Sequence, residues 1–139
     1  MIALTEWLMS IEHLAHEFYC AAADHYAEDI PLRNFLKHIA DDEADHYHIM
    51  SSAAQYLRTQ PPRAPGILVD GSIMEKIESQ LLGGLEEIKC STITKEKVLS
   101  LTIDSETSEW NDIFHYVLNT LKAQERIFEA AANRIDHHI

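Results

Sequence analysis

The sequence has few cysteines and places them far apart. Cys20 and Cys90 are the only two in 139 residues. Neither belongs to a CxxC pair, and two such distant cysteines do not indicate a disulfide framework. A zinc ribbon or a rubredoxin-type iron site, each of which needs four thiolates, therefore has no ligand set in this chain.

Long apolar runs and basic segments are also lacking. The N-terminal stretch MIALTEWLMSIEHLAHEF contains acidic residues and no basic region of the kind that opens a secretory signal. No segment reaches the roughly 18 consecutive apolar residues of a membrane-spanning helix. Basic residues number 11 against 23 acidic ones, and a net charge of −12 disfavours nucleic acid or an anionic membrane as partner. We expect a cytoplasmic protein with neither kind of partner.

Glycine and proline are scarce and clustered. The chain has four of each, and nearly all lie between positions 61 and 84. Patterns typical of strands are lacking, apart from the short GILV at 66–69. With 46% hydrophobic residues, the chain is long enough to form one domain with a sizeable core. We expect a single all-α domain over residues 1–139.

The spacing of apolar residues predicts four long helices, at about 4–29, 32–58, 95–118 and 122–139. Pro31 separates the first two, because proline disfavours helix in the residue before it and can itself start a helix. Thr94 is the predicted N-cap of the third helix. The connection at 61–93 is long and contains the pattern of a short helix at 72–88. Two helical hairpins joined by a long crossover are the plan of a ferritin-like four-helix bundle.

The second predicted helix places polar residues on its apolar face. In FLKHIADDEADHYHIM, residues 35–50, seven of sixteen positions are Asp, Glu or His, yet the apolar residues keep a helical spacing. Glu43 and His46 fall within that apolar face. Because they are three residues apart on a helix, their side chains can reach the same point. This pattern indicates a buried site.

Two further helices place carboxylates on or near an apolar face. Glu12 lies beside the stripe of the first helix, whereas Glu17 lies farther from the centre of that stripe. Glu106 lies in the middle of the apolar face of the third helix, and Glu109 lies at its edge. The neighbours that define the face around Glu106 are Leu99, Thr102, Ile103, Trp110 and Ile113.

Such a convergence of carboxylates favours a metal site. An ionised carboxylate alone in a core costs several kcal/mol, and three together also repel one another. A metal ion removes this cost as their shared counter-ion, and carboxylates with imidazole suit iron or manganese better than soft metals, with zinc as a further candidate. Glu12 or Glu109 alone would be interpreted as a surface acid. Together with Glu43, His46 and Glu106 they predict a metal centre.

Three segments resemble a known family. SIEHLAHEFYCAAA is similar to the first helix of rubrerythrin-like, ferritin-like proteins, in which a ligand glutamate precedes a tyrosine by seven residues; here these are Glu12 and Tyr19. HIADDEADH resembles the ExxH of the second helix, and LTIDSETSEWNDIF resembles the glutamate segment of the third. The resemblance implies a non-haem di-iron or di-manganese centre that reacts with peroxide or dioxygen. Without a rubredoxin site, electrons would come from a separate donor.

The last predicted helix departs from the family pattern. A second ExxH is expected there, but QERIF has Glu125 followed by Phe128 in the histidine position. Glu43 and His46 each follow Glu12 by a fixed interval. The same two intervals, counted from Glu106, lead to positions 137 and 140. His138 lies closer to the apolar face than its neighbour His137, so we expect His138 as a ligand without its usual glutamate. A truncated chain or a depleted site would have this pattern.

Two alternative functions and one assembly state remain open at this point. A non-enzymatic sensor or interaction domain would keep the bundle and a partial metal site. A hemerythrin-like oxygen carrier is suggested by the nine histidines, although the inward positions are mostly carboxylates. Trp7, Phe114 and the short helix in the connection offer more apolar surface than one small bundle buries, which favours a homodimer.

Overall fold

The described part of the chain is entirely helical. The computed structural model describes residues 2–59, 71–107 and 109–124, in which there is no strand. Its helices are α1 (Ile2–His25), α2 (Ile30–Arg58), α3 (Gly71–Lys89), α4 (Lys95–Glu106) and α5 (Glu109–Gln124). None of these helices is long and apolar enough to cross a membrane. The all-α prediction is confirmed, whereas the GILV segment and most of the predicted last helix lie outside the described residues.

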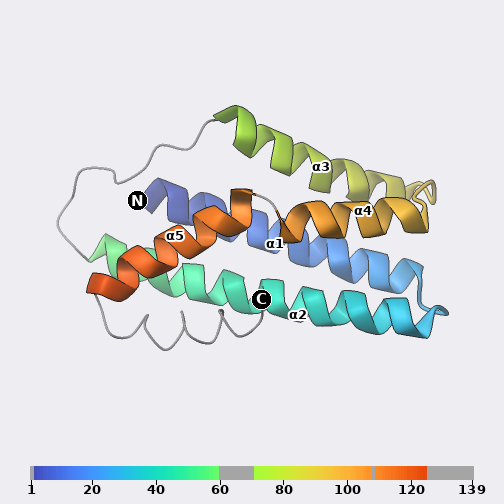
Figure 1. Ribbon diagram of the computed structural model, residues 1–139, viewed down its shortest axis with the longest axis horizontal. Helices are drawn as coiled ribbons and strands as arrows, with labels where there is room; N and C mark the ends of the chain where they lie inside the picture. The colour runs from blue at the N-terminus through green and yellow to red at the C-terminus, as the bar shows by residue number, and fades with distance from the viewer. Residues whose placement is uncertain (1, 60–70, 108, 125–139) are drawn as a thin grey trace.

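The helices pack into a bundle with alternating directions. α1 and α2 form an antiparallel hairpin, α3 runs in the direction of α1, and α4 and α5 return in the direction of α2 (Figure 1). The connection that contains α3 thus brings the chain back to the end of the bundle where α2 begins. α1 contacts α2, α3 and α5, and its inward face is a continuous part of the core.

Two capped helix starts lie together at one end of the bundle. Asp29 caps α2 by accepting a hydrogen bond from the Leu32 amide at 3.3 Å, next to Pro31 in the first turn. Thr94 caps α4 as predicted, because its hydroxyl accepts a hydrogen bond from the Lys97 amide at 3.1 Å. Lys95 also pairs with Asp29 at 3.0 Å. Local capping therefore fixes where both helices begin, and the ion pair links the two starts.

α3 confirms the helix predicted at 72–88 within the connection. It spans 19 residues and packs against α1 through buried Ile77, Leu81 and Gly84. Trp7 of α1 donates its indole N–H to the Glu78 carboxylate of α3 at 2.7 Å. Gly84 lies where α3 closely approaches Phe18 of α1 and Leu101 of α4.

The predicted third helix is broken, which corrects both its length and its apolar face. α4 ends at Glu106, because the backbone of the C-cap residue Thr107 leaves the helical conformation, with φ −107° and ψ 9°. α5 then begins at Glu109 and continues to Gln124, past the boundary predicted near 118–122. Leu99 and Ile103 of α4 are consequently exposed, whereas Trp110 of α5 is buried.

The two aromatic residues used to infer a homodimer pack inside the chain. Phe114 is fully buried, and Trp7 is half-buried against α3. Neither contributes the free apolar surface on which that inference depended. The argument is therefore wrong for these two residues, and the homodimer itself stays a prediction.

Adding a methyl group at Gly84 is expected to destabilise the bundle. A Cβ there would lie 2.7 Å from Phe18 Cε2 and 2.9 Å from Leu101 Cδ1, both belonging to buried side chains. Overpacking of this kind outweighs the better helix propensity of alanine, so Gly84→Ala should lower the free energy of unfolding by about 1–2 kcal/mol. Urea denaturation measures this change.

Gly83→Ala is the matched control, because a Cβ at position 83 meets nothing within 4 Å. This variant should raise the free energy of unfolding by up to about 1 kcal/mol, since alanine favours helix over glycine. Equal effects of the two substitutions would contradict the close approach of α3 to α1 and α4.

Candidate metal centre

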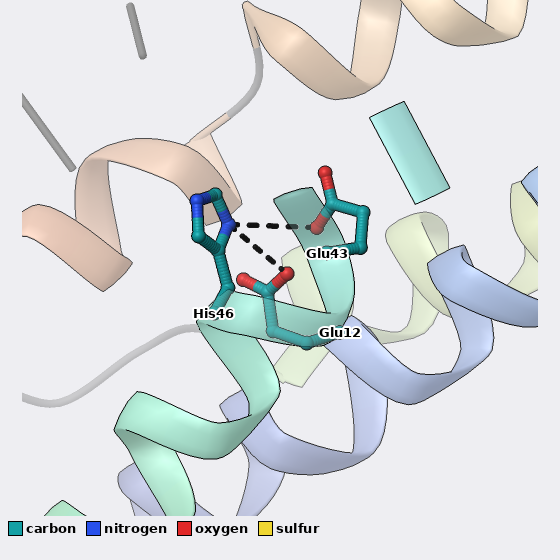
Figure 2. Close-up of side chains that lie close together, drawn as sticks. All are labelled: Glu12, Glu43 and His46. Carbon is teal, nitrogen blue, oxygen red and sulfur yellow. Dashed lines mark ion pairs between the residues drawn. The ribbon is translucent and has the colours of Figure 1, made fainter. Parts of the chain in front are cut away.

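Three ligand-type side chains meet in the interior between α1 and α2. Glu12 comes from α1, and Glu43 and His46 come from α2 (Figure 2). Their exposed fractions are 1%, 3% and 7%, so the prediction that they face inward is confirmed. Both helices are uninterrupted around these positions, and the residues one turn away, such as Leu8 and Ile39, belong to the hydrophobic core. The regular helical spacing therefore places these three polar groups in an apolar setting.

The distances within the cluster are those of atoms around a shared ion. His46 Nδ1 lies 3.4 Å from Glu12 Oε2 and 3.6 Å from Glu43 Oε2. One ligand atom from each residue lies within 4.8 Å of the other two. Two donor atoms that each bind an ion at about 2.1 Å are separated by about 3.0–3.5 Å. The cluster could thus hold a metal ion with small adjustments of the side chains.

Several polar atoms of the cluster are buried without a hydrogen bond. Glu12 Oε2, Glu43 Oε2 and His46 Nε2 have no hydrogen-bond partner within the part of the chain that the structure describes. A buried polar atom left in this state costs about 1–3 kcal/mol, and more when it is charged. Two of the three atoms are the carboxylate oxygens directed toward His46 Nδ1. A cation bound among them would satisfy both oxygens, so the donor set fits a metal ion.

Burial and mutual repulsion keep the carboxyl groups partly protonated. Burial raises the pKa of Glu12 from 4.5 to about 7, and the charge of Glu106 adds to this rise, while contacts with Glu43 and Trp110 oppose it. Burial also raises the pKa of Glu43 well above 4.5, with a further contribution from the charge of Glu12 and an opposing one from His46. Both carboxyl groups therefore bind a proton more tightly in the folded chain than they would in water.

Aromatic residues of α5 and α1 surround the cluster. Trp110 donates its indole N–H to Glu12 Oε1 at 2.8 Å, and the Phe114 ring stacks on the His46 ring with centroids 4.6 Å apart. The Tyr19 hydroxyl is buried and burial raises its pKa, with the charges of Glu43 and Glu106 adding to the rise. The sequence indicated Trp110 and Phe114 only as core or interface aromatics. No local pattern connects Trp110 to Glu12, which lies 98 positions away.

Glu106 lies at the border of the cluster and not inside it. It is the last residue of α4 and is exposed, so the prediction that it occupies the middle of a buried face is wrong. Desolvation still raises its pKa, and its carboxyl group interacts with Glu43 and is attracted by His46. The group of ligand atoms within 4.8 Å does not include Glu106. Its role as a ligand stays a prediction.

The remaining candidate ligands are not placed by the structure. The side chain of Glu109, together with Glu125 and His138, lies outside the described residues. Glu17, which the sequence ranked below Glu12, is exposed and pairs with His13 at 2.7 Å on the surface. The candidate ligands that the structure brings together are thus Glu12, Glu43 and His46.

Comparison of the chain with protein-family models, with curated proteins and with solved structures gave no match. The class of protein is therefore defined by the fold and the site alone. Over its described residues the chain is all-helical and has a buried Glu–Glu–His cluster that could hold a metal ion.

Proposed function

We propose that this protein binds iron or manganese at Glu12, Glu43 and His46. The observation that carries the proposal is the pair of buried carboxylate oxygens, Glu12 Oε2 and Glu43 Oε2, that lack hydrogen-bond partners among the described residues and face one imidazole nitrogen. A donor set of two carboxylates and one imidazole suits these metals better than soft ones. Zinc is a weaker candidate for the same ligands.

The position of Glu43 supports a centre with two metal ions. Its carboxyl group interacts with the carboxyl groups of both Glu12 and Glu106. A carboxylate between two other carboxylates can act as a shared ligand for two ions. A di-iron or di-manganese centre of the rubrerythrin-like kind would then use Glu12 and His46 at the first ion and Glu106, with Glu109 and His138, at the second.

The proposed reaction is the reduction of peroxide or dioxygen. Iron bound at such a site supplies the electrons for this chemistry. The chain contributes a buried setting, in which Trp110 and Phe114 cover the cluster and limit the access of bulk water. The two cysteines do not form a rubredoxin site, so repeated turnover needs a separate electron donor.

Metal analysis of purified variants tests the proposal. Wild-type protein loaded with Mn²⁺ or Fe²⁺ and then desalted should retain metal, and Glu43→Ala should retain none, because it removes the central carboxylate. Glu106→Ala should lose the second ion. Glu17→Ala is the control, since Glu17 is exposed on the surface of α1, and it should retain the wild-type amount. Full occupancy in Glu43→Ala would refute the site.

A sensor with a single metal ion is the second candidate. It is favoured by the exposure of Glu106 and by the convergence of three ligands on one point. Such a protein would bind one ion and would not turn over peroxide. Absorption spectra of the iron-loaded protein after addition of peroxide or dioxygen separate the two candidates, because only the redox centre should show a change in the iron absorption that a reductant reverses.

A further inference from the structure

Trp110 makes a hydrogen bond that bears directly on the cluster. It lies in the first turn of α5, is 3% exposed, and donates its indole N–H to Glu12 Oε1 at 2.8 Å. The other oxygen of the same carboxylate, Glu12 Oε2, faces His46 Nδ1 at 3.4 Å and has no hydrogen-bond partner within the described ranges. The two oxygens of Glu12 thus have different surroundings.

We propose that Trp110 is a positioning residue that restricts Glu12 to one metal-binding oxygen. This inference rests on the proposed metal binding. Because the indole N–H occupies Oε1, only Oε2 remains directed at the point shared with Glu43 and His46. Outer hydrogen bonds of this kind orient carboxylate ligands and set how they bind. Glu12 therefore binds a metal ion through Oε2 alone.

The helix break at Thr107 makes this contact possible. In one continuous helix, Trp110 would share the face of Leu99 and Ile103, which are seven or more residues before it and are exposed. Thr107 ends α4, and α5 starts with a new phase, so that the indole is buried beside Glu12. The break thus has a defined consequence for the site, namely that it brings a hydrogen-bond donor to a ligand.

The chain contains a matched control for this interaction. Trp7, the other tryptophan, also donates its indole N–H to a glutamate oxygen, Glu78 Oε1, at 2.7 Å. Trp7→Phe removes an equivalent hydrogen bond between α1 and α3 and leaves Glu12 unchanged. A difference between Trp110→Phe and Trp7→Phe therefore reports the role of the indole at the cluster and not the general effect of losing a tryptophan.

The experiment is a titration of both variants and the wild type with Co²⁺, followed by visible absorption. Trp110→Phe should bind cobalt about tenfold more weakly. This is the lower end of the loss in metal affinity that is usual when a metal ligand loses its hydrogen-bond partner. The visible absorption per bound cobalt ion should also be weaker in this variant, because Glu12 without the indole hydrogen bond binds through both oxygens and raises the coordination number of the ion. Trp7→Phe should match the wild type in both respects. A Trp110→Phe spectrum that superimposes on that of Trp7→Phe would overturn the inference, whatever the affinity.

Two further results are possible, namely a wild type that binds no cobalt and a Trp110→Phe variant that does not fold. Absence of cobalt binding by the wild type would refute the proposed function and this inference with it, whereas equal spectra refute the inference alone. If Trp110→Phe does not fold, the Trp7→Phe protein gives the answer, because Trp110 is then its sole tryptophan. With Zn²⁺ bound, its indole proton should exchange with deuterium at least tenfold more slowly than that of free tryptophan. Exchange at the free rate would overturn the proposed hydrogen bond to the metal ligand.

Discussion

The Glu43→Gln variant is expected to melt at a higher temperature than the wild type in the absence of metal, and to gain nothing from added Mn²⁺. Glu43 is 3% exposed, its Oε2 has no hydrogen-bond partner among the described residues, and burial raises its pKa well above 4.5. A neutral amide removes the like-charge repulsion with Glu12. Its NH₂ group can also donate to the Glu12 oxygen that faces the cluster.

The expected size of this stabilisation follows from comparable substitutions. Replacing a buried ion pair with well-packed uncharged residues of similar volume is often neutral or raises stability by about 1–4 kcal/mol, and neutralising one of two repelling carboxylates acts in the same direction. For a domain of this length, each kcal/mol corresponds to about 3 °C in melting temperature. We therefore expect an increase of up to roughly 12 °C at pH 8, measured by circular dichroism in the presence of a chelator.

Glu17→Gln is the control for this prediction, since Glu17 is exposed and pairs with His13 on the surface. It should change the melting temperature by about 1 °C or less, as is usual for exposed ion pairs. A lower melting temperature of Glu43→Gln without metal would mean that the carboxylate stabilises the fold by itself. The cluster would then be structural, and the proposed function would lose its main support.

The parts of the site that could be predicted from the sequence lie on unbroken helices. Glu12, Glu43 and His46 were recognised because α1 and α2 keep a regular helical spacing over their whole length, so that apolar neighbours define the inward face. Short-range rules also gave the start of α4, where Thr94 caps the helix. Spacing and capping depend on residues within one or two turns, which is the range over which a sequence can be interpreted reliably.

The errors arise where the phase of a helix changes or where distant segments meet. A periodic pattern assumes one continuous helix, but α4 ends at Glu106 and α5 begins at Glu109, so the predicted face around Glu106 is wrong. The contact of Trp110 with Glu12 depends on the packing of α5 against α1 and has no local signal. Tertiary contacts over such separations follow from the packing of the whole bundle and not from helical spacing.

The metal-free protein is expected to lose stability as the pH rises from about 4.5 to about 7. A carboxyl group with a raised pKa binds its proton more tightly in the folded state than in the unfolded state. Below pH 4.5, Glu12 is protonated in both states and carries no penalty. Above pH 7, it is ionised in both, and the shift from 4.5 to about 7 corresponds to a loss of roughly 3 kcal/mol. Glu43 adds to this loss in the same direction.

Stabilisation by Mn²⁺ should accordingly be larger at pH 8 than at pH 5. A metal ion needs the ionised carboxylates, so at pH 5 it competes with protons on Glu12 and Glu43, whereas at pH 8 it binds to the charges that destabilise the apo fold. At one hundred times its dissociation constant at pH 8, the ion adds about 2.7 kcal/mol, or about 8 °C. The same concentration at pH 5 should add less than half of this. Glu43→Gln should show no gain at either pH. Equal gains in the wild type at both pH values would mean that the ion binds elsewhere. Only a site whose ligands lose protons when they bind the metal gives a larger stabilisation at the higher pH.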